Sequence, residues 1–236
     1  MELIISETIR TKFPDLRIGV VVAHSIDNTR YSEALASAVN LTFTSFADKH
    51  EGLDVFEEEK NIKIWRDVYR SFGTNPKKKT PTAEALLSRV IKSRFVPHIS
   101  PAVDSYLMAE TLHVLPIGGY DLEKVEGDIT LRFSNDQEKF VGIGNSDEEV
   151  LPAGEVVYAD SARILTRRWN YKDCDYAKIA DATKSVALFV EGPKQEITDS
   201  EICQTSEAMS ENLHKYCGGD VKTLFLSSTT NRIQLW

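Results

Sequence analysis

The sequence predicts an α+β fold in which a mixed or antiparallel sheet is layered with helices. Two observations support this prediction. Helical periodicity dominates residues 31–114, whereas short β-branched runs separated by turn residues dominate residues 128–190. Helices that precede a group of strands indicate α+β rather than a regular alternation of strand and helix. The 236 residues are enough to bury a core in one or two domains.

The N-terminal half contains one strand candidate and several helix candidates. Residues 16–23 form a short β-branched run bounded by Pro14, which is typical of a buried strand. Apolar residues that recur on one side predict three helices, over residues 31–50, 56–72 and 81–91. Residues 101–114 are a further helix candidate. Pro81 follows Thr80 and suits the first position of the third helix, where a missing N–H costs nothing.

The C-terminal half alternates strand candidates with turn residues. Short apolar runs predict strands over residues 128–133, 139–143, 154–159, 164–169, 185–190 and 221–227. Thr198 and Asp199 cap an acidic helix over residues 201–216, and Gly218 and Gly219 end it. We expect a single sheet to bury one apolar residue from each of five strands: Leu131, Val141, Val157, Ile164 and Leu188.

Changes in residue pattern divide the chain into three segments. Residues 1–60 are predicted to form an N-terminal α/β extension packed on a main domain over residues 61–195. Residues 196–236 add a helix and a strand to the same globule. Within the main domain, residues 116–121 predict a tight turn, because two successive glycines allow positive φ and close approach of another chain or a ligand.

Composition excludes several classes of protein. The chain has no run of about 18 apolar residues, so no membrane span is expected, and its N-terminus lacks the basic region of a signal peptide. Three cysteines without C-x-x-C spacing argue against a disulfide scaffold or a zinc site and fit a reducing compartment. The net charge of -8 argues against indiscriminate binding to DNA or RNA phosphates. We therefore expect a cytoplasmic protein without a metal.

One segment of this acidic chain is basic. Residues 61–95 hold nine Lys or Arg residues and only two acidic ones. Such a segment is either a solvated basic face or a local landing site for an RNA backbone. The candidates for RNA contact are Lys77, Lys78, Lys79, Lys92 and Arg94.

Familiar catalytic signatures do not occur in the sequence. It contains no G-x-S-x-G or H-E-x-x-H motif, no P-loop and no complete Rossmann fingerprint after Gly142. The five histidines are scattered along the chain, so each is expected to be structural or exposed. Nothing in the sequence predicts a cofactor.

Four short motifs give the main lead to function. They are Pro-Ile-Gly-Gly-Tyr-Asp at residues 116–121, Gly-Asp-Ile-Thr-Leu-Arg at 127–132, Gly-Glu-Val-Val-Tyr-Ala-Asp at 154–160 and Arg-Arg-Trp-Asn at 167–170. In this order and spacing they resemble the editing domain of the phenylalanyl-tRNA synthetase β subunit, formed by its third and fourth modules. They are most similar to the freestanding proteins built from that domain alone. The resemblance covers about residues 62–191 and makes residues 61–195 an editing-like domain.

The resemblance implies the fold of the editing domain and an activity on aminoacyl-tRNA. The reaction would be hydrolysis of the ester that joins a wrong amino acid to the 3′-terminal adenosine. Such a site needs no nucleophile, because backbone N–H groups and the vicinal hydroxyl of the substrate can position a water beside the ester carbonyl. The implied partners are tRNA or aminoacyl-tRNA, with the amino-acid moiety in the pocket. The implied pocket residues are Gly118, Gly119, Asp121, Asp160, Arg167, Trp169, Asn170 and Thr183, with Arg66, Glu84 and Arg89 at the mouth.

The chain departs from synthetases of bacterial type at two positions. Gly118 stands where they have a histidine that helps hold the substrate, and Phe189 stands where they have a glutamate that reads the hydroxyl of tyrosine. An aromatic ring cannot accept a hydroxyl proton, so specificity for tyrosine is not predicted. No aminoacylation core is visible either, so this chain alone is not expected to charge tRNA.

Less specific interpretations of the same residues stay open. The glycines can form a plain turn, Asp160 and Arg167 can pair to tie a hairpin together, and Arg66 and Arg89 can be surface residues. At the level of function, the alternatives are a non-catalytic RNA-binding or amino-acid-binding module and a hydrolase of small aminoacyl or acyl esters. The sequence does not predict whether the chain is an enzyme, which amino acid or tRNA it takes, or its oligomeric state.

Overall fold

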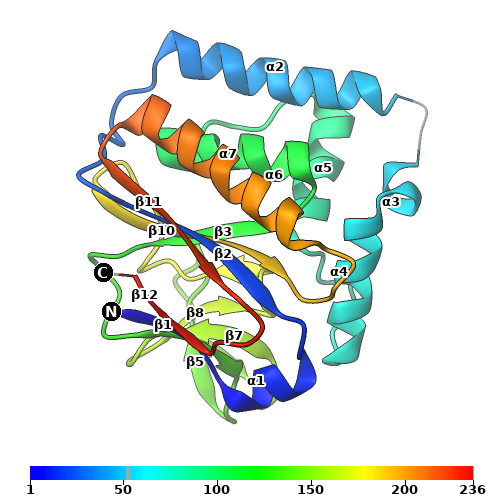
Figure 1. Ribbon diagram of the computed structural model, residues 1–236, viewed down its shortest axis with the longest axis vertical. Coiled ribbons are helices and arrows are strands. Elements are labelled where there is room, and N and C mark those ends of the chain that lie inside the picture. Colours follow the sequence, from blue (N-terminus) through cyan, green and yellow to red (C-terminus); the bar gives the residue numbers. More distant parts are fainter. Residues whose placement is uncertain (52–53, 236) are drawn as a thin grey trace.

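Two β-sheets pack against each other, and a layer of helices covers the outer face of one of them (Figure 1). The computed structural model describes residues 1–51 and 54–235. The covered sheet has four strands in the order β11 (Asp220–Leu226), β2 (Arg17–His24), β10 (Ser185–Gly192) and β3 (Ile117–Asp121). Every neighbouring pair in it is antiparallel.

The second sheet is mixed. Strand β1 runs parallel to β4, and the other neighbours are antiparallel. A separate pair, β5 (Glu138–Phe140) and β6 (Glu149–Leu151), flanks it. The order of the six strands is β12 (Arg232–Gln234), β1 (Glu2–Ile5), β4 (Ile129–Phe133), β7 (Val156–Ala159), β8 (Ile164–Arg167) and β9 (Lys172–Asp173).

The expectation of an α+β fold with mixed and antiparallel pairing is confirmed, but the expectation of a single sheet is wrong. Leu131, Val157 and Ile164 lie in the six-stranded sheet, whereas Leu188 lies in the four-stranded one. Val141 lies just after β5 and is only partly buried. The cause is that buried strands read alike in sequence, so the apolar pattern does not say which of two packed sheets a strand joins.

Helices form the third layer. In Figure 1, α6 (Pro101–His113) and α7 (Asp199–Cys217) lie over the four-stranded sheet, and α2 (Glu33–Lys49) lies beyond them. Gly19 on β2 lets α7 approach closely, because a Cβ at that position would stand 2.1 Å from the Ser206 hydroxyl oxygen. The capping box predicted at the start of α7 is present, with Thr198 and Glu201 satisfying each other's backbone N–H groups.

Further helices stand at the sides and ends of the sheets. They are α1 (Glu7–Lys12), α3 (Val55–Glu58), α4 (Lys60–Ser71) and α5 (Thr82–Ser93). The expectation of one helix over residues 56–72 is wrong, because the chain takes an extended conformation at Glu59 and splits it into α3 and α4. Pro81 immediately precedes α5 rather than occupying its first position.

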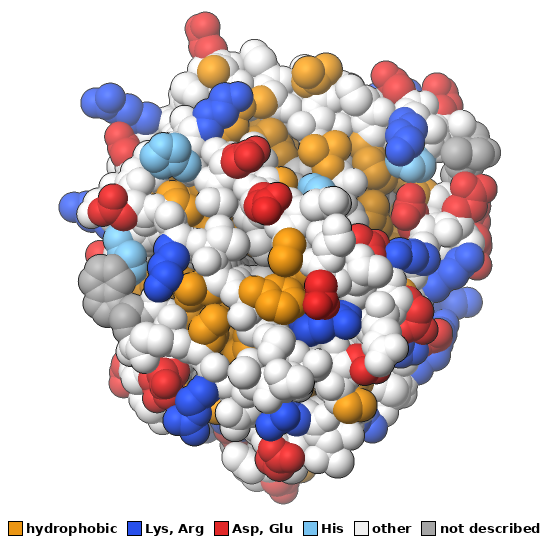
Figure 2. All heavy atoms as spheres, in the orientation of Figure 1, with side chains coloured by type: hydrophobic (Ala, Val, Ile, Leu, Met, Phe, Trp, Pro, Cys, Tyr) orange, Lys and Arg blue, Asp and Glu red, His pale blue; other side chains and the backbone are white. Residues whose placement is uncertain are grey.

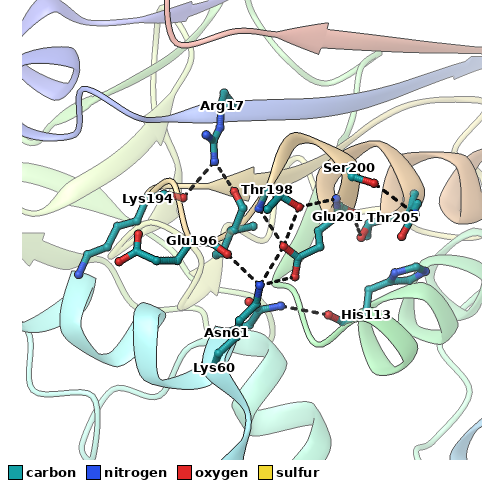
Figure 3. A network of polar contacts seen from close by, with 12 residues as sticks. Arg17, Lys60, Asn61, His113, Lys194, Glu196, Thr198, Ser200, Glu201 and Thr205 are labelled. Atoms are coloured by element: carbon teal, nitrogen blue, oxygen red, sulfur yellow. Dashed lines mark hydrogen bonds and ion pairs between the residues drawn. The ribbon is translucent and has the colours of Figure 1, made fainter.

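A polar network joins α4 to the beginning of α7 and to β2 (Figure 3). The Lys60 ammonium donates to the Glu196 carbonyl at 2.8 Å and pairs with the Glu201 carboxylate at 2.9 Å. Arg17 donates to the carbonyls of Lys194 and Ile197. The network fixes α4 against the sheets, which matters because Trp65 and Tyr69 of α4 contact Trp169 and Asn170 of the site described below.

Strands from all three predicted segments alternate within the two sheets. From residues 1–60, β2 lies between β11 and β10, and β1 lies between β12 and β4. The division into residues 1–60, 61–195 and 196–236 stays a prediction. Within residues 1–51 and 54–235, no helix is long and apolar enough to cross a membrane.

Candidate functional site

The two glycines of the first motif lie in strand β3, so the predicted turn over residues 116–121 is wrong. Neither Gly118 nor Gly119 has a positive φ. Their environments differ, because successive residues of a strand face opposite sides of the sheet. A Cβ on Gly118 would meet nothing within 4 Å, whereas one on Gly119 would stand 2.5 Å from Leu188 Cδ2 and 2.6 Å from the Ala187 carbonyl. Gly118 therefore faces open space, and Gly119 is packed against β10.

The space beside Gly118 is a cavity between the two sheets. It lies where β3 forms the edge of one sheet and β9 forms the edge of the other. It offers about 10 Å³ to the centres of water-sized molecules, which is room for about one water. A larger ligand therefore requires a wall to move. Its walls are Thr82, Ile117, Gly118, Tyr120, Tyr158, Thr166, Trp169, Asn170, Asp173, Phe189 and Glu191.

Trp169 and Asn170 reach the cavity from the short loop between β8 and β9. Arg168 and Trp169 both have left-handed backbone conformations, with φ of 47° and 69°. Such strain in large non-glycine residues persists only where the surroundings enforce it, and it clusters at functional sites. Here the Trp169 ring is completely buried, with its centroid 5.2 Å from Trp65 of α4 and 4.8 Å from Phe13. The packing of Trp169 fixes the position of Asn170.

Asn170 carries an unused hydrogen-bond donor into the cavity. Its Oδ1 accepts a hydrogen bond of 2.6 Å from the Tyr69 hydroxyl. Its Nδ2 is buried and has no hydrogen-bond partner within the protein. Buried polar atoms without partners are rare in folded proteins, and each calls for an explanation such as a water, an ion or a functional role. The free donor makes this cavity the candidate binding site.

Two buried carboxyl groups line the cavity, and a third lies behind its wall. Glu191 of β10 accepts a hydrogen bond of 2.7 Å from the Tyr158 hydroxyl, and burial raises its pKa to about 7. Asp173 of β9 accepts one of 2.5 Å from the Thr166 hydroxyl, and burial raises its pKa to about 6. Glu110 of α6 lies behind Thr82 and Ile117, and burial raises its pKa to about 8. All three therefore titrate close to neutrality.

Several residues expected in the pocket lie elsewhere. The buried Arg167 guanidinium points away from the cavity and pairs with Glu155 at 2.8 Å and Glu149 at 2.5 Å. The alternative ion pair between Arg167 and Asp160 is not formed either. Asp160 instead accepts the N–H groups of Ala162 and Arg163 at 2.8 and 2.7 Å and closes the turn between β7 and β8.

Asp121 and Thr183 form a structural pair outside the cavity. The Thr183 hydroxyl donates to Asp121 at 2.7 Å and accepts the Ala180 N–H at 3.0 Å, which fixes the turn that enters β10. Of the eight pocket candidates, Gly118, Trp169 and Asn170 line the cavity.

The residues expected at the mouth of the pocket connect helices. Arg66 of α4 and Glu84 of α5 form a two-pronged ion pair with distances of 2.9 and 2.8 Å. Arg89 lies exposed farther along α5. Arg66 also pairs with Glu57 at 3.2 Å, so α3, α4 and α5 are joined through this one guanidinium.

The basic candidates form two separate groups. Lys77, Lys78 and Lys79 lie in the loop before α5, whereas Lys92 and Arg94 lie at its far end. A twelve-residue helix is about 18 Å long, so the two groups are not one surface. Arg94 is also paired with Asp48 at 2.6 Å.

Most of the polar residues that line the cavity were not predicted from the sequence as site residues. Phe189 does line the cavity, directly opposite Gly118 in the β3–β10 pairing. Glu191 lies two residues later on the same face of β10 and lines it as well. The two-residue period of a strand was the available signal for Glu191. Nothing comparable pointed to Thr82, Tyr158, Thr166 or Asp173, which reach the cavity through tertiary packing.

A family model described as the B3/4 domain matches residues 64–216. The chain belongs to the B3/4 domain family. This domain is found in the β subunit of phenylalanyl-tRNA synthetase, so the resemblance seen in the sequence is confirmed. All the residues that line the cavity lie within the B3/4 match.

This B3/4 protein is also similar to a solved structure, an N-terminal fragment of the phenylalanyl-tRNA synthetase β subunit from Pyrococcus horikoshii. The identity is 13% and the TM-score is 0.47. The match covers 93% of this chain and 49% of that one, so the chain spans about half the length of the fragment. No curated protein sequence matches the chain.

Proposed function

We propose that this B3/4 protein binds the aminoacyl end of tRNA and hydrolyses the ester of a misattached amino acid. The observation that carries the proposal is the cavity beside Gly118, where the unpartnered Asn170 Nδ2 and buried carboxyl groups meet the open space over the Gly118 Cα. An ester group requires such mixed surroundings, because its carbonyl accepts hydrogen bonds while the attacking water donates them. Membership of the B3/4 family supports the same proposal.

Asn170 is suited to orient the ester carbonyl. Its Nδ2 is a free donor in the cavity, and the Tyr69 hydroxyl fixes its amide plane. A donor fixed before the reaction stabilises the charge that develops on the carbonyl oxygen during water attack. None of the five histidines, all within the described residues, lines this cavity. We therefore assign the positioning of the water to backbone groups and to the vicinal hydroxyl of the substrate.

The basic loop lies beside the cavity. The Lys79 ammonium is 3.4 Å from the Tyr171 hydroxyl and 5.1 Å from the centre of its ring. Tyr171 is the neighbour of Asn170 in the sequence, and Thr82 lies three residues after Lys79. Lys79 and Tyr171 are therefore each within three residues of a residue that lines the cavity. Lys78, Lys79 and Arg168 also line a shallow hollow of about 380 Å³.

An RNA backbone held at this loop would bring its 3′ end to the cavity. We therefore restrict the proposed RNA contact to Lys77, Lys78, Lys79 and Arg168, and leave out the distant Lys92 and Arg94. Figure 2 shows a gathering of Lys and Arg side chains at the edge of the molecule where Figure 1 places α4, on a surface that is otherwise mixed in charge. A local basic site on an acidic body favours docking of one RNA end over wrapping of a duplex. Action on charged tRNA would place the protein in the cytoplasm.

A deacylation screen tests the proposal. Purified protein is added to a panel of mischarged tRNAs, and release of the amino acid is followed over time. We expect at least one mischarged tRNA to be deacylated ten or more times faster than in buffer. Binding of tRNA without any acceleration would favour the non-catalytic alternative, and equal cleavage of small amino-acid esters would favour the small-ester hydrolase.

A further inference from the structure

The two carboxyl groups that line the cavity face each other from different sheets. Glu191 enters from β10 of the four-stranded sheet, and Asp173 enters from β9 of the six-stranded sheet. Glu191 accepts a hydrogen bond from the Tyr158 hydroxyl and is also stabilised by the Trp169 indole N–H, and Asp173 accepts one from the Thr166 hydroxyl. All of these donors are neutral. A carboxylate removed from water is stabilised far better by a cation than by a hydroxyl.

No Lys, Arg or His lies among the described residues that line the cavity. Three cations of the β8–β9 hairpin are used on its outside. Arg167 and Arg168 pair with Glu155 at 2.8 and 2.6 Å, and the Lys172 ammonium lies 3.5 Å from Glu149. The hairpin thus places these three cations on Glu149 and Glu155, and the cavity wall holds Asp173 and Glu191 without a basic residue.

We infer that Asp173 and Glu191 form a receptor for the α-ammonium group of the substrate, so that the site accepts amino-acid esters with a free amine and rejects N-acylated ones. The inference rests on the proposed function and specifies its substrate class. A resident metal is not favoured, because the described residues contain no group of three or more acidic, His or Cys side chains arranged to hold one.

Asn170 provides the second half of the recognition. Its side chain is 7% exposed, and its Nδ2 has no partner. An aminoacyl ester presents an ammonium group and a carbonyl group separated by a single carbon atom. The cavity presents two carboxylates and an amide donor within a space that holds about one water.

Acylation of the amine removes the feature that the site requires, because it replaces a charged donor of three hydrogen bonds with a neutral N–H. The carboxylates would then be buried without a counter-ion, which is more costly than an unmade contact in water.

The inference is tested by binding, independently of hydrolysis. The probes are amide-linked 3′-aminoacyl derivatives of 3′-amino-3′-deoxyadenosine carrying alanine, phenylalanine or tyrosine, each compared with its N-acetyl counterpart by calorimetry. We expect at least one free amine to bind ten or more times more tightly than its acetylated partner. Equal affinities, or no binding of any free amine, would overturn the inference.

Substitutions locate the discrimination. Asp173→Asn and Glu191→Gln keep the size of the side chain and should reduce the ratio between free and acetylated probes to about one. Because the ratio is measured within a single protein sample, partial unfolding does not imitate this result. Asp175→Asn is the matched control, since Asp175 lies two residues along but outside the cavity, and it should keep the full ratio. An unchanged ratio in both cavity variants would contradict the assignment.

Ester-linked counterparts of these probes, with free and with N-acetylated amines, separate this inference from the proposed function. Equal hydrolysis of free and N-acetylated esters would contradict the ammonium receptor and would still support the proposed hydrolysis. If no ester is cleaved although the free-amine probes bind selectively, the ammonium receptor stands and the proposed hydrolysis fails.

Discussion

Glu110, Asp173 and Glu191 are the residues whose chemistry the fold changes most. Each is an ordinary carboxylate in the unfolded chain and titrates between about 6 and 8 after burial. The protonated form is therefore bound more strongly by the folded state than by the unfolded state. The stability that these groups contribute is fully present below about pH 4, and it is lost as the pH rises through their folded values.

We predict that the free energy of unfolding falls between pH 5 and pH 8. One unit of difference in pKa corresponds to about 1.4 kcal/mol, so the three carboxyls together contribute a slope on the order of 1 kcal/mol or more per pH unit. Urea unfolding at successive pH values measures this slope. Glu110→Gln should reduce the slope because its amide stays neutral.

Glu138→Gln serves as the control for this experiment. Its hydrogen bonds with Arg132 and Asn135 lower the pKa of Glu138, so its linked stability is lost at lower pH and the slope between pH 5 and pH 8 should not change. A stability that is constant or rising across that range in the unmodified protein would contradict the burial of these three groups.

At the residue scale, sequence motifs found the correct loop but not the direction of every side chain. Trp169 and Asn170 reach the cavity as expected, whereas Arg167 does not. The left-handed backbone at Arg168 and Trp169 reverses the chain, and no local pattern in the sequence predicts two such residues in succession. Asp173 and Glu191 had no signal as partners, because they meet only when the two sheets pack.

At the element scale, the loop before α5 connects the basic segment with the cavity. Lys77 and Lys78 are exposed, and the Lys79 ammonium contacts the Tyr171 hydroxyl. The loop therefore presents three positive charges close to the wall formed by Thr82.

We predict that replacing Lys77, Lys78 and Lys79 with Gln weakens tRNA binding and reduces its salt dependence. Each phosphate contact contributes about 0.7 to 0.9 units to the slope of log K against log salt, so the slope should fall by about two units. Titration of labelled tRNA at several salt concentrations measures it. Lys222→Gln is the control, because Lys222 is exposed on β11, at the edge of the four-stranded sheet opposite to β3. An unchanged slope in the triple variant would make the loop an ordinary solvated surface.

Long, capped helices and buried strands were predictable from the sequence, and short edge strands were not. α2 and α7 have apolar faces and capping residues, and α6 begins at Pro101 after the capping residue Ser100. Each of the three lies where the sequence placed it. β6, β9 and β12 have only two or three residues, too few to show a period of two. These short strands form by pairing with neighbours that are distant in sequence.

At the scale of the whole molecule, the site depends on the packing of two sheets. β3 and β9 are edge strands of different sheets, and the cavity forms where these edges meet. Residues far apart in the sequence, from Thr82 to Glu191, therefore contribute to one small space. The sequence predicted the α+β class and the B3/4 resemblance, but it could not predict that the strands divide between two sheets, because each buried strand is apolar on both faces.

The central claim is that the cavity beside Gly118 holds the aminoacyl ester, and the deacylation rate of Gly118→Val tests it most directly. A β-branched side chain suits a strand with ordinary φ, and the first added carbon meets no neighbour, so the fold should keep its melting temperature. Gly119→Ala is the contrasting control, because its Cβ would collide with Leu188 and Ala187 and should destabilise the fold. We predict that Gly118→Val deacylates mischarged tRNA at least tenfold more slowly than the unmodified protein while remaining folded. Full activity in a folded Gly118→Val protein would contradict the account.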